Sequence, residues 1–289
     1  MELRRRALEI LQTAEPAAKA AAARALEPLL RAGPIDTGAV LQPGGPLPGR
    51  PARPRLVAPA SLPRRTPFTP EGRAALLHAV AHIEFNAINL AADAAWRFPA
   101  MPEAFYRDWL RVAAEEALHF TLLAEHLATL GHAYGDFDAH DGLWSMAEAT
   151  AGDLLARMAL VPRTLEARGL DATPPMQERF RRAGDARAVE ILDVILRDEI
   201  GHVAIGNRWF GWLCAGRGLD PVVAYEELAA RYGAPRLKPP FNLAARQAAG
   251  FSAAEIAALE GRSGSAGLPE PPRGAGRDTG PALGAHGVT

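Results

Sequence analysis

Two Glu-x-x-His motifs inside apolar helical stripes constrain the fold of this chain more than any other feature. The first motif lies in Glu-Glu-Ala-Leu-His at 115–119, and the second lies in Asp-Glu-Ile-Gly-His at 198–202. Glu and His three residues apart share one face of a helix, so each pair can bind the same centre. Apolar residues continue both faces in each direction, so the pairs are expected where the helices meet the core. The four side chains are Glu116, His119, Glu199 and His202.

Two more glutamates fall where an apolar side chain is expected. Glu84 interrupts the apolar face of one helical segment, and Glu166 interrupts that of another. Glu84 precedes Glu116 by 32 residues and Glu166 precedes Glu199 by 33, so the chain repeats a glutamate helix followed by a Glu-x-x-His helix. Two antiparallel hairpins of this kind bring all six side chains to one level. One Glu from each of two helices and Glu-x-x-His from two others is the ligand set of ferritin-like di-metal carboxylate proteins.

The charge of these glutamates requires a partner. A lone buried carboxylate costs several kcal/mol, and four of them would consume roughly the whole stability of a domain. Two divalent cations with neutral imidazoles balance four carboxylates. Arginine pairing is the alternative, but the neighbouring arginines are not expected beside the glutamates on the inward faces: Arg73, Arg111, Arg157 and Arg163. The pattern therefore favours a two-metal site over buried salt bridges.

The predicted architecture is all-α, a ferritin-like four-helix bundle with extra N- and C-terminal helices and an extended Pro-rich arm. Long helices are predicted at 69–98, 102–131, 142–169 (kinked at Pro162) and 185–216, with shorter ones at 220–232 and 252–260. The chain then divides into an N-terminal helical segment (1–32), a Pro/Gly-rich arm (33–69), the bundle with its C-terminal helices (70–260) and a disordered tail (261–289). Caps, prolines and glycines set these boundaries.

Composition removes several classes of function. The net charge is −1, so no overall field recruits nucleic acid or an anionic membrane. The single cysteine, Cys214, excludes an intramolecular disulfide and a cysteine-based metal site within one chain. The chain has no run of 18 uncharged apolar residues, and its N-terminus lacks the apolar stretch of a secretory signal. We therefore expect no membrane span and a cytoplasmic protein.

Several segments resemble a bacterial ferritin-like (di-iron carboxylate) family of unknown function. The resemblance covers about 50–260 and is carried by His-Ile-Glu-Phe-Asn-Ala-Ile-Asn-Leu-Ala-Ala-Asp (82–93), Asp-Trp-Leu-Arg-Val-Ala-Ala-Glu-Glu-Ala-Leu-His-Phe (108–120), Tyr-Gly-Asp (134–136), Arg-Met-Ala-Leu-Val-Pro-Arg-Thr-Leu-Glu-Ala-Arg-Gly-Leu-Asp (157–171) and Pro-Pro-Phe-Asn (239–242). It implies the fold and the metal site, and says little about the reaction.

Two acids beside the ligands are candidates for orienting the histidines. In related di-iron enzymes, the acid before a ligand glutamate reaches the histidine on the partner helix and fixes its ring. On this analogy Asp198 contacts His119 and Glu115 contacts His202. The alternative is that both acids are solvated helix residues.

The leading functional hypothesis is an oxidoreductase in which two irons activate dioxygen to oxidise or hydroxylate a small molecule. The alternatives are a non-redox ferritin-like protein that holds iron or manganese and a metal-free helical binding module. A nucleic-acid substrate is disfavoured because the chain is neutral overall.

Overall fold

The computed structural model describes residues 2–63 and 65–264. Within them the regular structure is entirely helical, apart from an isolated bridge between Leu56 and Ala139. The α-helices are α1 (Leu3–Gln12), α2 (Pro16–Arg24), α3 (Pro70–Arg97), α4 (Glu103–Thr129), α5 (Gly142–Ala149), α6 (Leu154–Leu160), α7 (Ala167–Arg182), α8 (Ala186–Arg217), α9 (Pro221–Arg231), α10 (Leu243–Ala248) and α11 (Ala253–Gly264). Single 3₁₀ turns lie at Glu27–Leu29 and Pro59–Ser61, and a π-helix, η3, spans Val161–Glu166.

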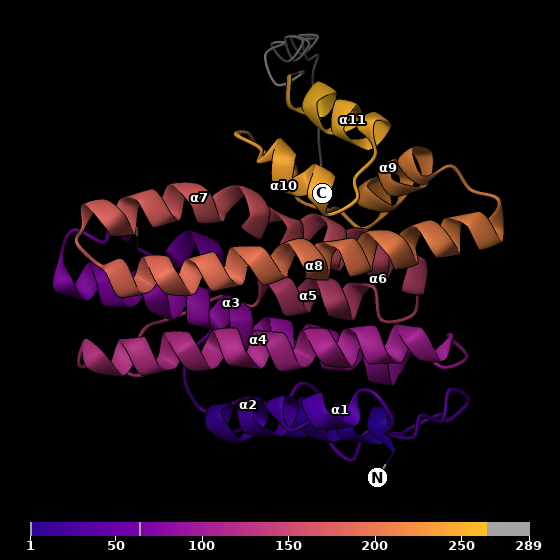
Figure 1. Ribbon diagram of the computed structural model, residues 1–289, viewed down its shortest axis with the longest axis horizontal. Coiled ribbons are helices and arrows are strands. Elements are labelled where there is room, and N and C mark those ends of the chain that lie inside the picture. Colours follow the sequence, from indigo (N-terminus) through magenta and orange to yellow (C-terminus); the bar gives the residue numbers. More distant parts are fainter. Residues whose placement is uncertain (1, 64, 265–289) are drawn as a thin grey trace, which may run out of the picture.

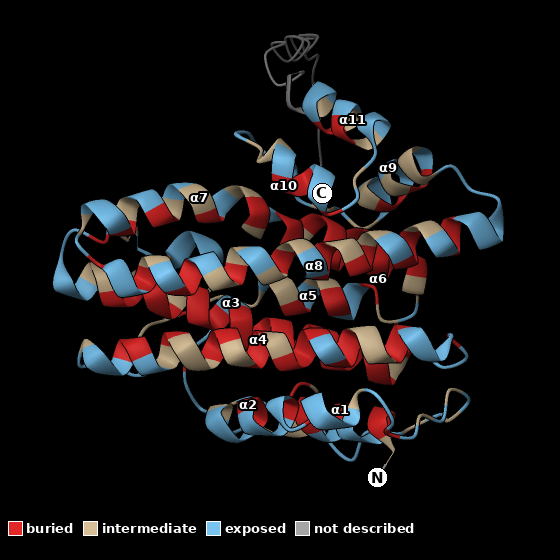
Figure 2. Cartoon of the chain, in the orientation of Figure 1, coloured by how far each residue is buried: buried red, intermediate tan, exposed pale blue. Residues whose placement is uncertain are grey.

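Three long helices and one interrupted helical segment form the centre of the molecule (Figure 1). α3 packs along α4, α4 packs against α8, and α8 packs against α6, η3 and α7. Figure 2 shows that the buried residues concentrate on the facing sides of these helices. The all-α prediction is confirmed for the described residues. The finer assignment to a ferritin-like bundle stays a prediction.

The predicted helix boundaries agree closely for three of the long helices. The Thr69 hydroxyl accepts a hydrogen bond from Gly72 N at 3.2 Å and caps the start of α3. Gly131, with φ of +78°, follows the end of α4, and Gly218, with φ of +65°, follows the end of α8. Glycine adopts this left-handed conformation without a steric penalty, so both positions suit helix ends.

The single helix predicted at 142–169 is wrong. The chain instead forms α5, breaks at 150–153, restarts as α6 and passes through η3 into α7, which continues to Arg182. Asp153 caps the new start by accepting a hydrogen bond from Ala156 N at 3.1 Å. Arg157 stabilises the break, because it donates to Thr150 Oγ1 at 2.9 Å and to the Ala147 carbonyl. Helix α10 was not predicted at all.

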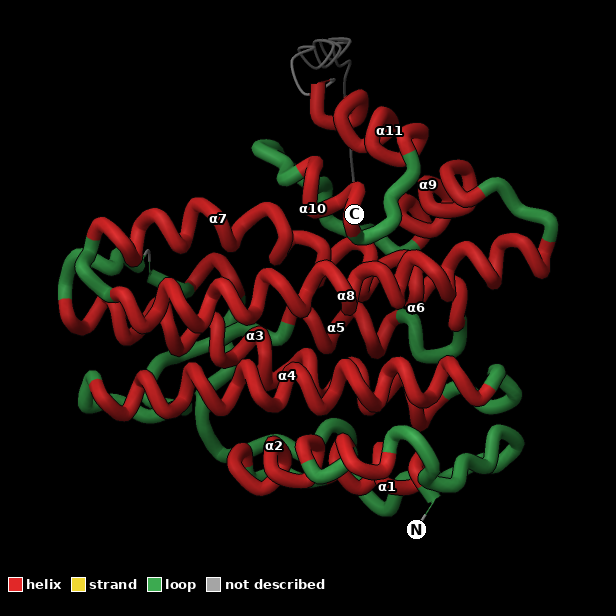
Figure 3. The backbone as a smooth tube through the Cα atoms, in the orientation of Figure 1, coloured by secondary structure: helices red, strands yellow, loops and turns green. Residues whose placement is uncertain are grey.

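The flanking helices cover opposite sides of the central helices (Figure 3). α1 and α2 pack on α3 and α4, whereas α9, α10 and α11 lie on the side of α6, α7 and α8. The arm follows the loop after α4: Val57 N donates to Ala139 O at 2.8 Å, and Arg50 pairs with Asp141 at 2.5 Å. The predicted tail, 261–289, lies outside the described residues beyond Gly264, and α11 runs four residues past its predicted end.

No helix among the described residues combines the length and apolar character needed to cross a membrane.

Candidate metal centre

Four of the predicted ligands converge in one buried cluster. Glu84 of α3, Glu116 and His119 of α4, and Glu199 of α8 each offer a ligand atom, and these atoms lie within 4.8 Å of one another. All four residues are buried, with Glu116 and His119 fully inaccessible. The cluster could hold a metal ion.

His202 and Glu166 lie beside these four residues. His202 Nδ1 is 2.9 Å from Glu116 Oε1 and 3.9 Å from Glu199 Oε1. Glu166 ends the π-helix, and its Oε2 is buried without a hydrogen-bond partner among the described residues. Its pKa lies well above the usual value because of burial and then because of the nearby Glu199 and Glu116 carboxylates.

Glu116 lies between the two histidines. Its Oε2 is 3.3 Å from His119 Nδ1, and its Oε1 is 2.9 Å from His202 Nδ1. Glu84 Oε2 approaches the same His119 nitrogen at 3.1 Å. Both imidazoles therefore direct Nδ1 at the carboxylates, and their ring centroids are 5.8 Å apart.

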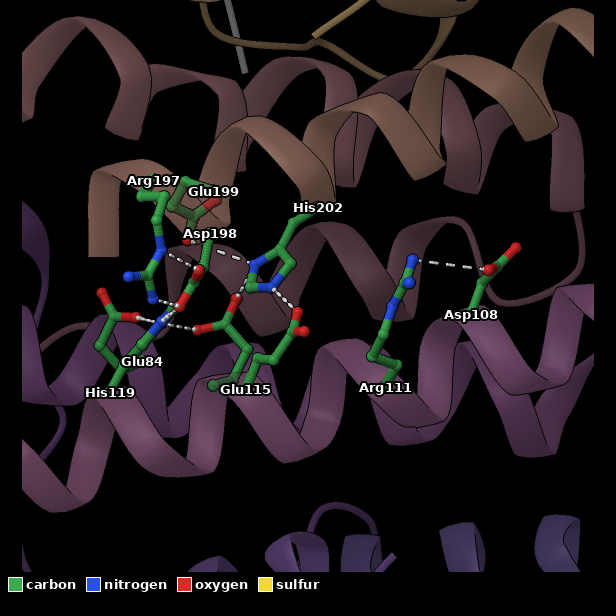
Figure 4. Close-up of polar contacts among 10 residues, drawn as sticks. Glu84, Asp108, Arg111, Glu115, His119, Arg197, Asp198, Glu199 and His202 are labelled. Carbon is green, nitrogen blue, oxygen red and sulfur yellow. Dashed lines mark hydrogen bonds and ion pairs between the residues drawn. The ribbon is translucent and has the colours of Figure 1, made fainter. Parts of the chain in front are cut away.

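The outer nitrogen of each histidine meets an acid on the opposite helix (Figure 4). His119 Nε2 is 3.1 Å from Asp198 Oδ2, and His202 Nε2 is 2.8 Å from Glu115 Oε2. These are the pairings that the sequence predicted, although the role of the acids beside a metal stays a prediction. An acid that accepts Nε2–H leaves the Nδ1 lone pair for another partner.

Arg197 is a neighbour that the sequence did not indicate. Its Nε donates to Asp198 Oδ1 at 2.9 Å and its Nη2 to Asp198 Oδ2 at 3.1 Å. Burial opposes ionisation of Asp198, but the hydrogen bonds from His119 and Arg197 outweigh it and lower the pKa. Arg197 is exposed and lies off the apolar face, so no periodic signal marks it.

Burial and the charges of neighbouring side chains shift the pKa values of the cluster residues. Burial, and then the Glu116 carboxylate, raises the pKa of Glu84 and that of Glu199. Burial opposes ionisation of Glu116, yet His202 and His119 outweigh it and lower its pKa. Burial alone would lower the pKa of both histidines, but their acidic partners raise it well above the usual value. The cluster therefore retains protons among its carboxylates and imidazoles.

Arginines do not neutralise the cluster directly. Arg157 pairs with Asp93, Arg163 with Glu255, and Arg111 with Asp108 at 3.7 Å. Arg73 lies 4.0 Å from Asp185. Among the described residues, none of the six predicted ligands forms an ion pair with an arginine.

A cavity of about 220 Å³ reaches the cluster from one side. Glu84, Glu166 and Glu199 line it, whereas His119 and His202 do not. The remaining wall is mostly apolar and comes from α3, α5, α7 and α8. The sequence does not indicate this cavity. The helices that line it take their relative positions from the break between α5 and α6, which the sequence did not predict.

Comparisons with known proteins identify relatives but no activity. Residues 12–257 match the family described as "Protein of unknown function (DUF455)". An "Uncharacterized protein" of Haemophilus influenzae is 56% identical over 213 residues, which cover 71% of this chain and 74% of that protein. No solved structure matches the chain significantly.

Proposed function

This chain belongs to the DUF455 family of proteins of unknown function, and we propose that its buried cluster binds two divalent metal ions, iron in the first instance, which activate dioxygen to oxidise a small organic substrate. The proposed fold is the ferritin-like bundle, formed by α3, α4, the segment from α6 to α7, and α8. Each of these four elements supplies a carboxylate to the site.

Unpartnered ligand atoms are the observation that carries this proposal. Among the described residues, eight buried side-chain atoms lack a hydrogen-bond partner, and four of them belong to the six predicted ligands. These four are Glu116 Oε1, Glu166 Oε2, Glu199 Oε2 and His202 Nδ1. Leaving such an atom unsatisfied costs about 1–3 kcal/mol, and more if it is charged. Glu116 Oε1 and His202 Nδ1 face each other at 2.9 Å as an ion pair without forming a hydrogen bond, whereas Glu166 Oε2 and Glu199 Oε2 have no donor among the described residues. Metal coordination would satisfy all four atoms.

The donor set also suits the proposed ions. Four carboxylates and two imidazoles accept iron or manganese, and two divalent ions balance four ionised glutamates. In their absence, protons are retained where the Nδ1 atoms face the carboxylates. The residues present therefore fit a two-metal centre.

The contacts suggest how the residues divide between two ions. Glu116 approaches both histidines, and Glu84 approaches His119. Glu84, Glu116, His119 and Glu199 would hold one ion, and His202 and Glu166 beside them would supply the further ligands that a second ion needs. Asp198 and Glu115 hold the imidazoles in the orientation that directs Nδ1 inward.

When bound, the ions would supply electrons to dioxygen and an oxidant to the substrate. The chain binds and orients these reactants and keeps bulk water out. The three glutamates at the floor of the cavity are buried and the wall above them is mostly apolar, so a bound substrate would displace water from the site.

Oxygen uptake by ferrous protein tests the proposal. Anaerobically reconstituted protein should hold two ferrous ions per chain, consume dioxygen on mixing, and gain near-ultraviolet absorption from ferric iron. Glu116→Ala and Glu199→Ala should lose both the uptake and the absorption, because each removes a ligand from the cluster.

Two exposed glutamates on the same helices provide matched controls. Glu103 on α4 pairs with Arg107 at the surface, and Glu190 on α8 pairs with Arg187 at 3.0 Å. Glu103→Ala and Glu190→Ala should behave as the unmodified protein does. If the unmodified protein holds two ferrous ions yet reacts with neither dioxygen nor peroxide, a non-redox role replaces the oxidase. A metal content far below one ion per chain would favour the binding module.

A further inference from the structure

The cavity beside the cluster has a polar rim above an apolar wall. Its floor contains Glu84, Glu166 and Glu199, and its wall includes Ile83, Leu143, Leu165, Met176, Leu192 and Ile195. Arg168 and His140 also line it. Both lie nearer solvent than the glutamates, since Arg168 is exposed and His140 is half-buried.

Arg168 has no structural partner among residues 2–63 and 65–264. Its guanidinium makes no hydrogen bond or ion pair with them, although many arginines of this chain pair with an acid or a carbonyl. A positive charge beside an apolar cavity, without a counter-ion from the protein, is available to an anionic ligand.

His140 supplies a second donor at the same rim. Its Nδ1 accepts a hydrogen bond from Gly142 N at 3.1 Å, so the ring proton of the neutral form lies on Nε2. Burial, and then the positive charge of Arg168, lowers the pKa of His140, which favours this neutral form near pH 7. The rim therefore offers one cation and one N–H donor.

The placement of the histidine ligands decides which end of a ligand approaches the cluster. His119 and His202 pair with their acidic partners across α4 and α8 and do not line the cavity, so the cavity approaches the cluster through Glu84, Glu166 and Glu199. An apolar group that enters the cavity would lie against these three glutamates. A charged group would stay at the rim, because burying it against the apolar wall costs free energy.

We propose that the cavity binds a small molecule with an apolar body and one carboxylate or phosphate, with Arg168 and His140 holding the anionic group and the apolar body lying against Glu84, Glu166 and Glu199. This proposal rests on the proposed function, because it names the substrate class of the same site. Pockets that bind drug-sized ligands have volumes of about 300–1,000 Å³. The cavity volume of about 220 Å³ therefore indicates a smaller molecule.

Calorimetric titration with three eight-carbon probes tests the proposal. Octanoate and octyl phosphate provide the two anionic groups, and 1-octanol provides the same apolar body without a charge. Metal-loaded protein should bind at least one anion about tenfold more tightly than it binds 1-octanol. This difference in affinity corresponds to the lower end of the range for a hydrogen bond to a charged group, which we expect because Arg168 is exposed. The preferred anion identifies the natural group as carboxylate or phosphate.

Arg168→Gln should remove most of this preference and leave the affinity for 1-octanol unchanged. The matched control is Arg182→Gln, since Arg182 is also exposed on α7 but does not line the cavity. Ala172→Trp, at the exposed rim, should weaken all three probes because it fills the mouth. Equal affinities for the anions and 1-octanol, no binding of any probe, or equal losses in the two arginine variants would overturn the proposal.

The same titration on metal-free protein separates this proposal from the metal proposal. If two ions bind but the anions show no preference that depends on Arg168, the substrate class is wrong and the metal centre stands. If the protein fails to bind metal but still binds the anions more tightly than 1-octanol through Arg168, the proposed ligand class of the cavity is correct and the proposed oxidase function is wrong.

Discussion

Among the residues beside the cluster, Asp198 most directly orients a proposed metal ligand, His119. It accepts from His119 Nε2, while Arg197 donates to both of its oxygens. Its side chain is 17% exposed, whereas that of Glu115 beside His202 is 38% exposed. Exposure weakens a charge-assisted hydrogen bond because water competes for it. Asp198 should therefore contribute more to metal affinity than Glu115 does.

Asp198→Asn tests this positioning role. The amide keeps the shape of the side chain but can donate to Nε2, which favours the tautomer that places the proton on Nδ1. Loss of such a partner weakens metal binding by about 10–100-fold. Competition for manganous ion with a chromophoric chelator should show this loss, with a smaller one for Glu115→Gln. Asp108→Asn is the control, because Asp108 lies two turns before Glu115 on α4 (Figure 4) and accepts a hydrogen bond from Trp209 Nε1 at 2.9 Å. Equal affinity in all variants would contradict the role.

His78 offers a pH-dependent measurement away from the cluster. Burial, followed by the nearby His82 and Arg65, lowers its pKa to about 4, with Asp136 opposing the shift. The unfolded chain then binds more protons than the folded chain between pH 4 and 6.5, so the unfolding free energy falls as pH decreases through this range. In chelator, His78→Gln should reduce this dependence, and part of it should remain because burial also lowers the pKa of His82 to about 4. Glutamine keeps an acceptor for Gly135 N, which lies 2.9 Å from Nε2. Urea unfolding of both proteins measures the difference, and parallel pH profiles would refute the assignment.

At the scale of elements, the π-helix is the part of the site that sequence patterns did not indicate. η3 spans Val161–Glu166 and ends on a cluster residue. Pro162 lacks an N–H, so an α-helical hydrogen bond is missing there, and a kink is the usual expectation. The chain instead widens into a π-helix, a form that appears often at functional sites. Periodicity of 3.6 residues placed Glu166 correctly on an inward face, but it could not indicate the change of helix type.

Gly206 of α8 permits the close approach of this π-helix. A Cβ at this position would lie 2.6 Å from Pro162 Cβ and 2.7 Å from Pro162 Cγ, so one of the two segments would have to move. Gly206→Ala should therefore destabilise the protein by about 1–3 kcal/mol and reduce metal content by displacing Glu166. Calorimetric melting and metal analysis measure the two effects.

Gly211→Ala on the same helix is the matched control. A Cβ there meets no atom within 4 Å, so the helix propensity of alanine should stabilise the protein by up to about 1 kcal/mol. If Gly206→Ala and Gly211→Ala have the same melting temperature and metal content, the close packing of Gly206 against Pro162 does not position Glu166.

At the scale of the whole molecule, the sequence predicted which glutamates are buried better than it predicted the connections between helices. Glu84, Glu116 and Glu199 could be located because each charge interrupts an apolar stripe, a local signal. The break at 150–153 depends on Arg157, whose partners include Asp93 of α3, 64 residues away. Such a contact has no local signature. The same reason applies to Arg168 and His140, which become neighbours of the cavity only through the packing of α7 and the loop before α5.

Metal-dependent stability is the expected property of the whole molecule, because the cluster joins α3, α4, η3 and α8, which pack together at the centre of the fold. Each ion that binds only the folded chain stabilises it by about 2.7 kcal/mol at a free concentration of 100 times its Kd, so two ions stabilise it by about 5 kcal/mol. Each kcal/mol raises Tm by roughly 2–4 °C, so the loaded protein should melt about 10–20 °C above the metal-free protein. Ferrous or manganous ion should restore the difference after chelation.

The double variant Glu116→Ala/Glu199→Ala should fold without metal and show no such rise in Tm, since it removes two buried carboxylates along with the site. A Tm of the unmodified protein that responds to neither metal nor chelator would contradict the metal centre itself.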